Sequence, residues 1–378
     1  MSKGAEPTPI HEVEQGLIQG HQLMAMLFLA RMVPITVTFP AITGIPIPQD
    51  GWIAVLLSVL ATIPVALWIV WLGLSFPGKT IVEYSEILFG KVVGKLLGLG
   101  LILFFLGKAA TTARAIGEAY AVAIMPETPI VIVMAVMVFL GANAAHGGLE
   151  VVGRMAESVF WMVLFFALLV LVLPANAMKV ENLRPVLPGG LGAAVGEAGT
   201  SWIIFLETIV VGMIMPFLTC PSDARRFSLY AVGAAGLVGV GFAAVLVAVF
   251  GVLAPSLTLP AFSLGRMISV GGFLERVEVI PMGVWTVSAG IKIACFIWAS
   301  AAGLAQVFGL QRYQPLVYPL GVLTVSLGLS LFKNITDVEM MVDPRGSGVC
   351  IIVALVSYMT ILSLARLLRG HRAEANGR

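Results

Sequence analysis

The sequence predicts an all-α polytopic membrane protein, with ten transmembrane helices arranged as a five-plus-five inverted repeat. The first observation is composition: 59% of the 378 residues are hydrophobic and only 11% are charged, whereas about 25% of a soluble domain is charged. The second is that the apolar residues divide into ten segments of about the length that crosses a bilayer. The third is that the first and sixth segments are both interrupted near mid-depth, as in an inverted repeat.

The ten predicted spans form one transmembrane domain, residues 17–368, between two cytoplasmic tails. The N-terminal tail, residues 1–16, is polar and acidic, unlike the basic start of a cleaved signal peptide. The C-terminal tail, residues 369–378, is basic. Because five is odd, the second repeat, about 200–368, inserts upside down relative to the first, about 17–174. The spans are residues 17–40, 52–73, 96–124, 129–145, 158–174, 200–219, 229–253, 281–304, 315–332 and 347–368.

The lysines and arginines of the connections predict the orientation, because cytoplasmic loops carry an excess of both residues. Twelve lie on one side of the predicted membrane and six on the other. The richer side includes both termini, which we therefore place in the cytoplasm. The twelve are Lys3, Lys79, Lys91, Lys95, Arg154, Arg225, Arg226, Arg312, Arg366, Arg369, Arg372 and Arg378, and the six are Lys179, Arg184, Arg266, Arg276, Lys333 and Arg345.

Three connections are longer than a turn. After the second span, Thr80 and Glu83 form a capping box that predicts a short cytoplasmic helix along the membrane surface. Residues 182–199, rich in proline and glycine, predict an outer loop with about one helical turn. Residues 254–280 are too many for a simple connection, and we expect them to cap the outer face.

The sixth span contains three features that a plain spanning helix does not need. Glu207 is ionisable, Gly212 is flexible, and Pro216 lacks a backbone donor. The first span has Arg31 and Pro34 near its middle. Broken helices in hydrocarbon are tolerated only where protein or a water-filled cavity covers the backbone, so the two breaks indicate a binding site. The simpler explanation is that proline and glycine merely kink these helices, since both are frequent in membrane spans.

The third span divides into two faces at 100° per residue. Small residues occupy one face, which favours close packing against another helix. Polar residues share an arc of about 160° on the other, which predicts a helix with a cavity before it. Arg114 and Glu118 are spaced for an i,i+4 pair and lie outward of Lys108, which indicates an outer vestibule. The polar residues are Lys108, Thr111, Thr112, Arg114 and Glu118, and the small face contains Ala109, Ala110, Ala113, Ile116 and Gly117.

The ionisable residues expected inside the bilayer leave an excess of two positive charges. An uncompensated charge there costs several kcal/mol. Either the lysines exchange their protons, or an anionic ligand supplies the missing charge. The structural alternative is a set of satisfied pairs, such as Arg31 with Glu207 across the breaks or Lys292 with Glu207. The cations are Arg31, Lys108, Arg114 and Lys292, and the anions are Glu118 and Glu207.

Several classes of chemistry have no support in the sequence. No nucleotide-binding loop, nucleophile arrangement or zinc spacing is present, which argues against an enzyme, a metal centre, a cofactor or a nucleic-acid partner. The three cysteines, Cys220, Cys295 and Cys350, have no paired spacing and indicate neither a metal site nor a disulfide framework.

Four separated motifs resemble the B subunits of spore germinant receptors, the spore permease family within the amino acid/polyamine/organocation transporter superfamily. They are FPGKTIVEYSEILFGKVVGKLLGLG after the second span, GLEVVGRMAE before the fifth, LRPVLPGG in the outer loop and FLERVEVIPMGVWTVSAGIKI entering the eighth. The resemblance covers nearly the whole chain. It implies a five-plus-five repeat, a ligand held where the first and sixth spans unwind, and a place in the spore inner membrane beside an A subunit and a lipoprotein C subunit.

The resemblance and the intramembrane charges together give the candidate site. The segment from Arg31 to Pro34 departs from the small, glycine-containing break usual in the superfamily, so a ligand pose cannot be copied from ordinary permeases. The coupling groups would be Lys108, Lys292 and Glu207. The candidate ligand-binding residues are Arg31, Val33, Pro34, Thr36, Lys108, Thr111, Thr112, Glu207, Thr208 and Gly212.

Three functions are compatible with these residues. In the first, the protein is a germination receptor subunit that binds a small germinant, an amino acid, at the breaks and signals to its partners. In the second, it is a proton-coupled amino-acid permease that uses the same site. In the third, it is a scaffold with an inert site, whose intramembrane charges could be removed without effect.

The charge distribution makes a testable prediction about topology. A reporter protein fused after Arg372 should behave as cytoplasmic, and one inserted near Gly189 as external, because the cation-rich side stays inside. Activity of a compartment-sensitive reporter such as alkaline phosphatase checks both positions. The opposite result at either one would overturn the inverted-repeat assignment.

Overall fold

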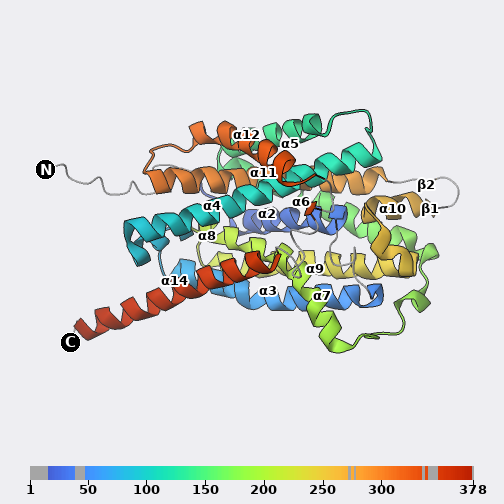
Figure 1. Ribbon diagram of the computed structural model, residues 1–378, viewed down its shortest axis with the longest axis horizontal. Coiled ribbons are helices and arrows are strands. Elements are labelled where there is room, and N and C mark those ends of the chain that lie inside the picture. Colours follow the sequence, from blue (N-terminus) through green and yellow to red (C-terminus); the bar gives the residue numbers. More distant parts are fainter. Residues whose placement is uncertain are drawn as a thin grey trace.

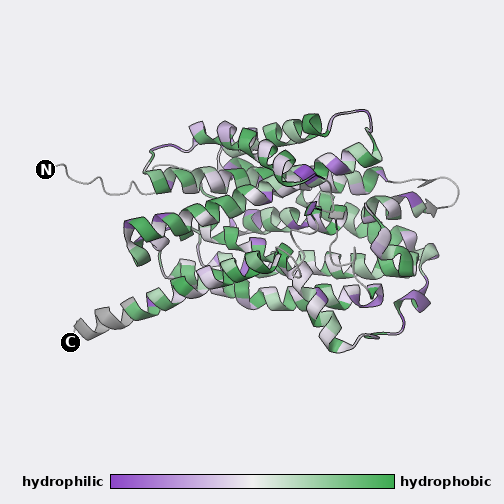
Figure 2. Ribbon diagram, viewed as in Figure 1, coloured by the Kyte–Doolittle hydropathy of each residue, from purple (hydrophilic) through white to green (hydrophobic). Residues whose placement is uncertain are grey.

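The computed structural model describes residues 16–38, 47–270, 274–275, 278–333, 337–338 and 348–376 of the chain. Figure 1 shows a bundle of helices that run roughly along the long axis of the molecule. Figure 2 shows hydrophobic residues along most of their length, as expected of helices surrounded by lipid. Large apolar side chains are exposed on the outside of the bundle, for example Trp161 at 72% and Phe139 at 58%.

Ten apolar helices account for the predicted spans. Within the described part of the chain, nine helices are long and apolar enough to cross a membrane, and α5 (Ile130–His146) is a tenth, shorter one. The protein is therefore a multi-pass membrane protein, as predicted. The others in the first half are α2 (Gly20–Val33) with the π-helical turn η1 (Pro34–Thr38), α3 (Gly51–Leu74), α4 (Ile81–Ala123) and α6 (Leu149–Val172).

The second half is built from α7 (Gly190–Phe205), α8 (Val211–Ile214), α9 (Asp223–Phe250), α11 (Val279–Phe308), α12 (Gln314–Leu331) and α14 (Gly348–Asn376). Short elements complete the fold: the 3₁₀ turns η2 (Pro48–Asp50), η3 (Leu173–Ala177), η4 (Val180–Leu183), η5 (Leu206–Val210), η6 (Met215–Phe217) and η7 (Gly251–Ser256), helix α10 (Pro260–Met267), and strands β1 (Ser269–Val270) and β2 (Leu274–Glu275).

Helices α2 and α11 lie at the centre of the bundle. Nearly every side chain of α2 is buried, and α11 contacts α2, α4, α5 and α6. The start of the first span is joined to the end of the sixth span by backbone hydrogen bonds. Ile18 N–H donates to the carbonyl of Phe217 at 2.9 Å, and Thr219 N–H donates to the carbonyl of Ile18 at 3.0 Å. The entry to α2 is thus attached to the exit of the sixth span.

The capping box after the second span is confirmed, and it begins a short helix at the start of α4. Thr80 N–H donates to Glu83 Oε2 at 2.8 Å, and Glu83 N–H donates to Thr80 Oγ1 at 3.3 Å. The helix then breaks at Gly90, which has a φ of +78°, a conformation that favours glycine. The chain folds back so closely that a Cβ at Gly94 would lie 2.4 Å from Glu86 Cα. The short helix therefore packs against the start of the third span.

The outer loop between the fifth and sixth spans is shorter than predicted. Helix α7 begins at Gly190, inside the segment 182–199 that was expected to be a loop. The glycines of GLGAAVGEAG favour a loop, but the segment also contains alanine, the strongest helix former. Ala194 is fully buried, so tertiary packing supports this helical turn. The carboxylate Oδ1 of Asp50 accepts a hydrogen bond from Leu187 N–H at 2.8 Å and holds the remaining loop to α3.

The long connection after α9 has structure of its own, whereas its predicted place on the outer face stays a prediction. It contains η7, α10 and an antiparallel pair of two-residue strands, with Ser269 opposite Glu275. Helix α10 contacts α11 and η1, so this segment lies against the end of the first span. Residues 271–273 and 276–277 of it lie outside the described part of the chain.

The two faces of the third span are confirmed. Ala109, Ala110, Ala113 and Ile116 are fully buried. A Cβ at Gly117 would lie 2.7 Å from Ile130 Cγ1 of α5. The small residues therefore let α5 approach α4 closely, as in other membrane helix pairs.

Close packing of α5 on α11 leads to a prediction about stability. A Cβ at Gly141 would lie 2.7 Å from Ile293 Cγ2 and 3.2 Å from the backbone nitrogen of Ala294. Gly141→Val should therefore destabilise the protein by about 1–3 kcal/mol through overpacking. Thermal unfolding in detergent measures the effect. The control is Gly233→Val, at a position where a Cβ meets nothing within 4 Å; equal melting temperatures for the two variants would contradict the packing.

Candidate functional site

Both predicted interruptions are present, as changes of helical winding. Helix α2 ends at Val33 and continues as the π-helical turn η1 from Pro34, where proline cannot donate the regular backbone hydrogen bond. The sixth span changes from α7 to the 3₁₀ turn η5 at Leu206, and then to the single turn α8. In this arrangement Glu207 of η5 reaches α4 and α11, and Thr208 of the same turn reaches α2.

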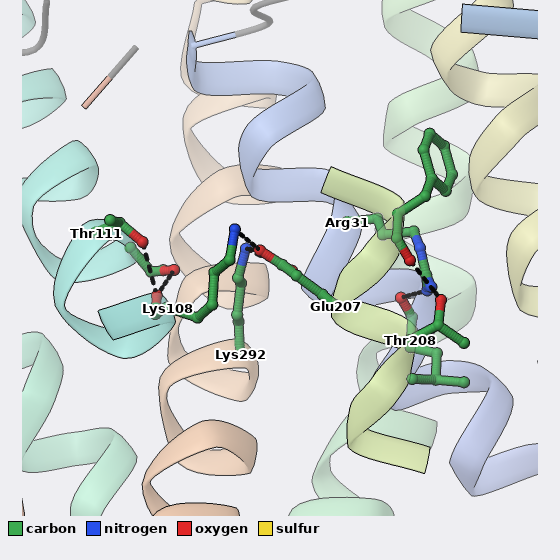
Figure 3. Close-up of polar contacts among 9 residues, drawn as sticks. Arg31, Lys108, Thr111, Glu207, Thr208 and Lys292 are labelled. Carbon is green, nitrogen blue, oxygen red and sulfur yellow. Dashed lines mark hydrogen bonds and ion pairs between the residues drawn. The ribbon is translucent and has the colours of Figure 1, made fainter. Parts of the chain in front are cut away.

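Glu207 of η5 is held between two lysines of different helices. Lys292 of α11 has its Nζ 2.9 Å from both carboxylate oxygens and donates a hydrogen bond to Oε1. Lys108 of α4 has its Nζ 3.3 Å from Oε1. The exposed fractions of the three side chains are 6% or less. Figure 3 shows both ammonium groups reaching the carboxylate from the same side. The first, third, sixth and eighth spans thus meet at or beside this carboxylate, which the sequence singled out.

Arg31 lies on the other side of the break and does not pair with Glu207. Its guanidinium donates to Thr208 Oγ1 and, at 2.6 Å, to the carbonyl of Leu27 (Figure 3). It also lies over the ring of Phe205, 5.5 Å from the centroid. The pairing of Arg31 with Glu207, considered from sequence, is therefore wrong. Arg31 joins α2 to η5 through Thr208, and its 1% exposed fraction shows that the contact is fully enclosed.

A small cavity of about 40 Å³ adjoins the two lysines and Glu207. Because about 10–15 Å³ of such space holds one water molecule, it has room for only a few. It brings together residues that the sequence predicted from separate spans. Its lining consists of Val33, Pro34, Lys108, Thr111, Thr112, Ala115, Ile204, Glu207, Lys292 and Val338.

The other candidate ligand residues lie outside this cavity. The Thr36 hydroxyl donates to the carbonyl of Met32 at 2.6 Å. Gly212 packs on α4, since a Cβ there would lie 3.0 Å from Ile81 Cβ. Within the cavity, Thr111 and Thr112 both donate to the carbonyl of Lys108, at 3.0 and 2.7 Å. Both hydroxyls can still accept hydrogen bonds, because a hydroxyl has one donor hydrogen and two acceptor lone pairs.

Sequence reasoning missed the apolar side of the cavity. Ile204, Ala115 and Val338 complete its lining. Ile204 precedes the break and Ala115 lies one turn beyond Thr111, so their spacing from recognised residues was a usable signal. Val338 belongs to a segment with no distinguishing pattern, and nothing in the sequence indicated its place.

The predicted outer pair also forms. Arg114 pairs with Glu118, and its guanidinium donates to the carbonyl of Lys333 at 2.6 Å. These contacts neutralise both charges and join α4 to the end of α12. The excess positive charge is therefore concentrated at the central cluster, where one carboxylate, Glu207, faces Lys108, Lys292 and the nearby Arg31. Among the described residues, no group of histidine, cysteine or acidic side chains could hold a metal ion.

Comparisons with known proteins agree on one family. Residues 17–338 match the family described as spore germination protein. Spore germination protein KB of Bacillus subtilis (strain 168) is 28% identical over 335 residues, covering 86% of this chain and 88% of the relative. Spore germination protein B2 of the same organism is 24% identical over 333 residues, covering 85% and 87%.

Two solved structures with a similar fold are transporters. One is a Na⁺-coupled sialic acid symporter in a substrate-bound outward-open state, with a TM-score of 0.64 and 12% identity over 95% of this chain and 90% of the other. Another is Mhp1, a nucleobase-cation-symport-1 family transporter in a closed conformation, with a TM-score of 0.64 and 12% identity over 89% and 78%. The ten-helix fold predicted from sequence, with its inverted repeat and interrupted first and sixth helices, is therefore confirmed.

The central cluster predicts a strongly non-additive stability effect. Glu207→Gln removes the carboxylate that pairs with both lysines, and leaving buried charges unpaired costs about 3–5 kcal/mol. The double variant Glu207→Gln/Lys292→Met removes one of the stranded cations and should recover part of this loss. Thermal unfolding in detergent of the native protein, of Glu207→Gln and Lys292→Met alone, and of the double variant gives the coupling.

The matched control is Glu150→Gln, which breaks the exposed pair between Arg154 and Glu150. Such surface pairs contribute about 0–1 kcal/mol, so its melting temperature should hardly change. Simple addition of the Glu207 and Lys292 effects would show that the charges are not coupled.

Proposed function

Because the chain belongs to the spore germination protein family, we propose that it is a germination receptor subunit that binds a small carboxylate-bearing germinant, an amino acid, beside Glu207. The observation that carries this proposal is the charge of the buried cluster. Two cations, Lys108 and Lys292, contact one carboxylate in the membrane interior, and a third, Arg31, is buried on the other side of the break. A ligand carboxylate would compensate the excess, and a cavity lies next to the two ammonium groups.

The size of the cavity indicates how binding would act. At about 40 Å³ it holds a few waters or a carboxylate group, so a whole amino acid requires the helices around it to move. The changes of winding at η1 and η5 are the places where α2 and the sixth span can adjust. A ligand that fits only the expanded state shifts the population toward it, and the receptor would report that state to its partners.

The partners and the location follow from the family resemblance. We expect an A subunit and a lipoprotein C subunit beside this protein, in the spore inner membrane, with both termini in the cytoplasm and membrane lipid around the bundle. In this arrangement the movement of the helices around the cavity is read by subunits that touch the outside of the bundle.

A second candidate function is proton-coupled amino-acid transport. The observation that favours it is the fold, which is shared with two symporters at a TM-score of 0.64. A lysine that exchanges its proton as the helices move would couple such transport, and Lys292 is the candidate. The same residues serve both functions, so binding alone does not separate them.

Binding of the carboxylate can be tested on the purified protein in lipid nanodiscs. A panel of L-amino acids should include one or more that bind, and the matching amino-acid amides, which lack the carboxylate, should bind at least about tenfold more weakly. Lys108→Met should remove this difference, because the ammonium that recognises the carboxylate is lost. The control is Lys95→Met, outside the cavity. Equal affinity for acids and amides in the native protein would overturn the proposal.

Lys292 separates the receptor from the permease. In the receptor, the Lys292–Glu207 pair is a fixed charge pair, so Lys292→Arg should keep much of the germination response and Lys292→Met should lose it. Spore germination assays measure the response, and uptake of the bound amino acid into proteoliposomes measures transport. Loss of function in both variants, together with uptake by the native protein, would favour proton exchange and the permease. A full response with Lys292→Met would show that the lysine is structural.

A further inference from the structure

A second, larger cavity lies next to the small one. It is a groove of about 580 Å³ between α4 and α14, within the range of about 300–1,000 Å³ for sites that bind small molecules. Figure 1 shows α14 running obliquely away from the bundle, toward the end where α4 begins. The walls of the groove are mostly apolar and include Leu101, Phe104, Leu355 and Ile361. Its surface is thus suited to a hydrocarbon body.

Glycines of α4 give the groove its depth. Gly100 and Gly107 line it, and a Cβ at either position would meet nothing within 4 Å. Ala354 and Ser357 are the small residues opposite them on α14. The space is therefore created by missing side chains, and side chains placed at the two glycines would fill it without displacing the backbone.

Lys108 belongs to both cavities. It lines the groove and also the small cavity beside Glu207. Its Nζ lies 3.3 Å from Glu207 Oε1 and 5.5 Å from the centroid of Phe104, a residue of the groove. An ammonium has three donors, and Glu207 takes up one direction. Lys108 can therefore present a positive charge to a group that approaches along the groove.

From these contacts we infer that the ligand of this site is a carboxylate with an apolar body, its acid group at Lys108 and its hydrocarbon part in the groove between α4 and α14. The inference rests on the proposed function and adds the chemical class of the ligand. The small cavity alone has room for the acid group, and the groove supplies the volume that a larger ligand needs. The excess of positive charge around Glu207 favours an acid group, and the apolar walls of the groove favour a hydrocarbon body.

Two other occupants of the groove are distinguishable from this ligand. A hydrocarbon chain of the surrounding bilayer would fill it without regard to an acid group. A membrane helix of a partner subunit would cover both α4 and α14 and would exclude small molecules. Neither makes use of Lys108, the charged residue that lines both cavities.

The test uses straight-chain monocarboxylates, from acetate through butyrate and hexanoate to octanoate, with the matching alcohols as uncharged probes. Binding is measured on the full chain in nanodiscs, with empty nanodiscs subtracted. Each added methylene should tighten binding about fourfold, because its burial contributes about 0.8 kcal/mol. The acids should bind at least about tenfold more tightly than the alcohols.

Filling the groove should remove the dependence on chain length. In Gly100→Leu/Gly107→Leu, acetate should bind as in the native protein, and octanoate should bind no more tightly than acetate. The control is Gly233→Leu, on an exposed part of α9 where a Cβ also meets nothing within 4 Å, and it should keep the full dependence. An unchanged dependence in the double variant would show that octanoate only partitions into lipid, and would overturn the inference.

The native cysteines give a second measurement that needs no substitution. Cys350 lines the groove and is exposed, whereas Cys220 is exposed elsewhere and Cys295 is buried. Octanoate should slow alkylation of Cys350 by N-ethylmaleimide at least about fivefold and leave the rate at Cys220 unchanged, and octanol at the same concentration should protect much less. Equal protection by acid and alcohol would indicate bulk lipid-like occupancy and contradict the inference.

The outcomes distinguish a failure of the proposed carboxylate site from a failure of the groove as part of that site. If acetate itself does not bind, or binds equally to Lys108→Met, the proposed carboxylate site fails. If acetate binds but longer acids gain nothing, the carboxylate site stands and the groove is not part of it. If co-expression with a partner subunit protects Cys350 and abolishes the chain-length dependence, the groove is a subunit interface and the inference is wrong.

Discussion

The carboxylate of Glu207, held between Lys108 and Lys292, is the interaction on which the rest of the structure depends. In a membrane interior an unpaired charge costs several kcal/mol, so these three groups stabilise one another in this conformation. Glu207 is brought there by the 3₁₀ turn η5, and the lysines by α4 and α11. One ionic cluster therefore connects the sixth span to the third and the eighth, and the contact between Arg31 and Thr208 adds the first.

The same cluster leaves the site incompletely compensated. Its single negative charge faces more than one positive charge, and the outer pair of Arg114 and Glu118 is self-contained. In the proposed function, a ligand with a carboxylate would change this balance at a place where four spans meet. Since binding can shift a conformational equilibrium only by its differential affinity for the two states, this position gives a small anion an influence over the whole bundle.

Sequence predicts those features of this protein that depend on hydropathy and local chemistry. Bilayer thickness sets the length of each span, so the apolar segments of that length can be counted from the sequence. The Thr80–Glu83 capping box is a local pattern that the sequence also shows. Tertiary contacts decide the rest. Packing of Ala194 extends α7 into an expected loop, and the choice of Thr208 over Glu207 as the partner of Arg31 depends on the winding of η5. Val338 reaches the cavity from a segment with no local signal.

Helix α4 explains how a rigid bundle can contain an adjustable site. Its alanine face is fully buried, and at Gly117 its backbone approaches α5 so closely that a Cβ would overlap Ile130. That face has no free volume for movement, since packed interiors tolerate little displacement. Its other face carries Lys108 and borders both cavities. On the proposed binding, movement would come from the elements across the cavities: η1 and η5 at the changes of winding, and α14, which lies obliquely to the bundle (Figure 1). In this proposal α4 holds the ammonium of Lys108 in place, and η1, η5 and α14 move when a ligand binds.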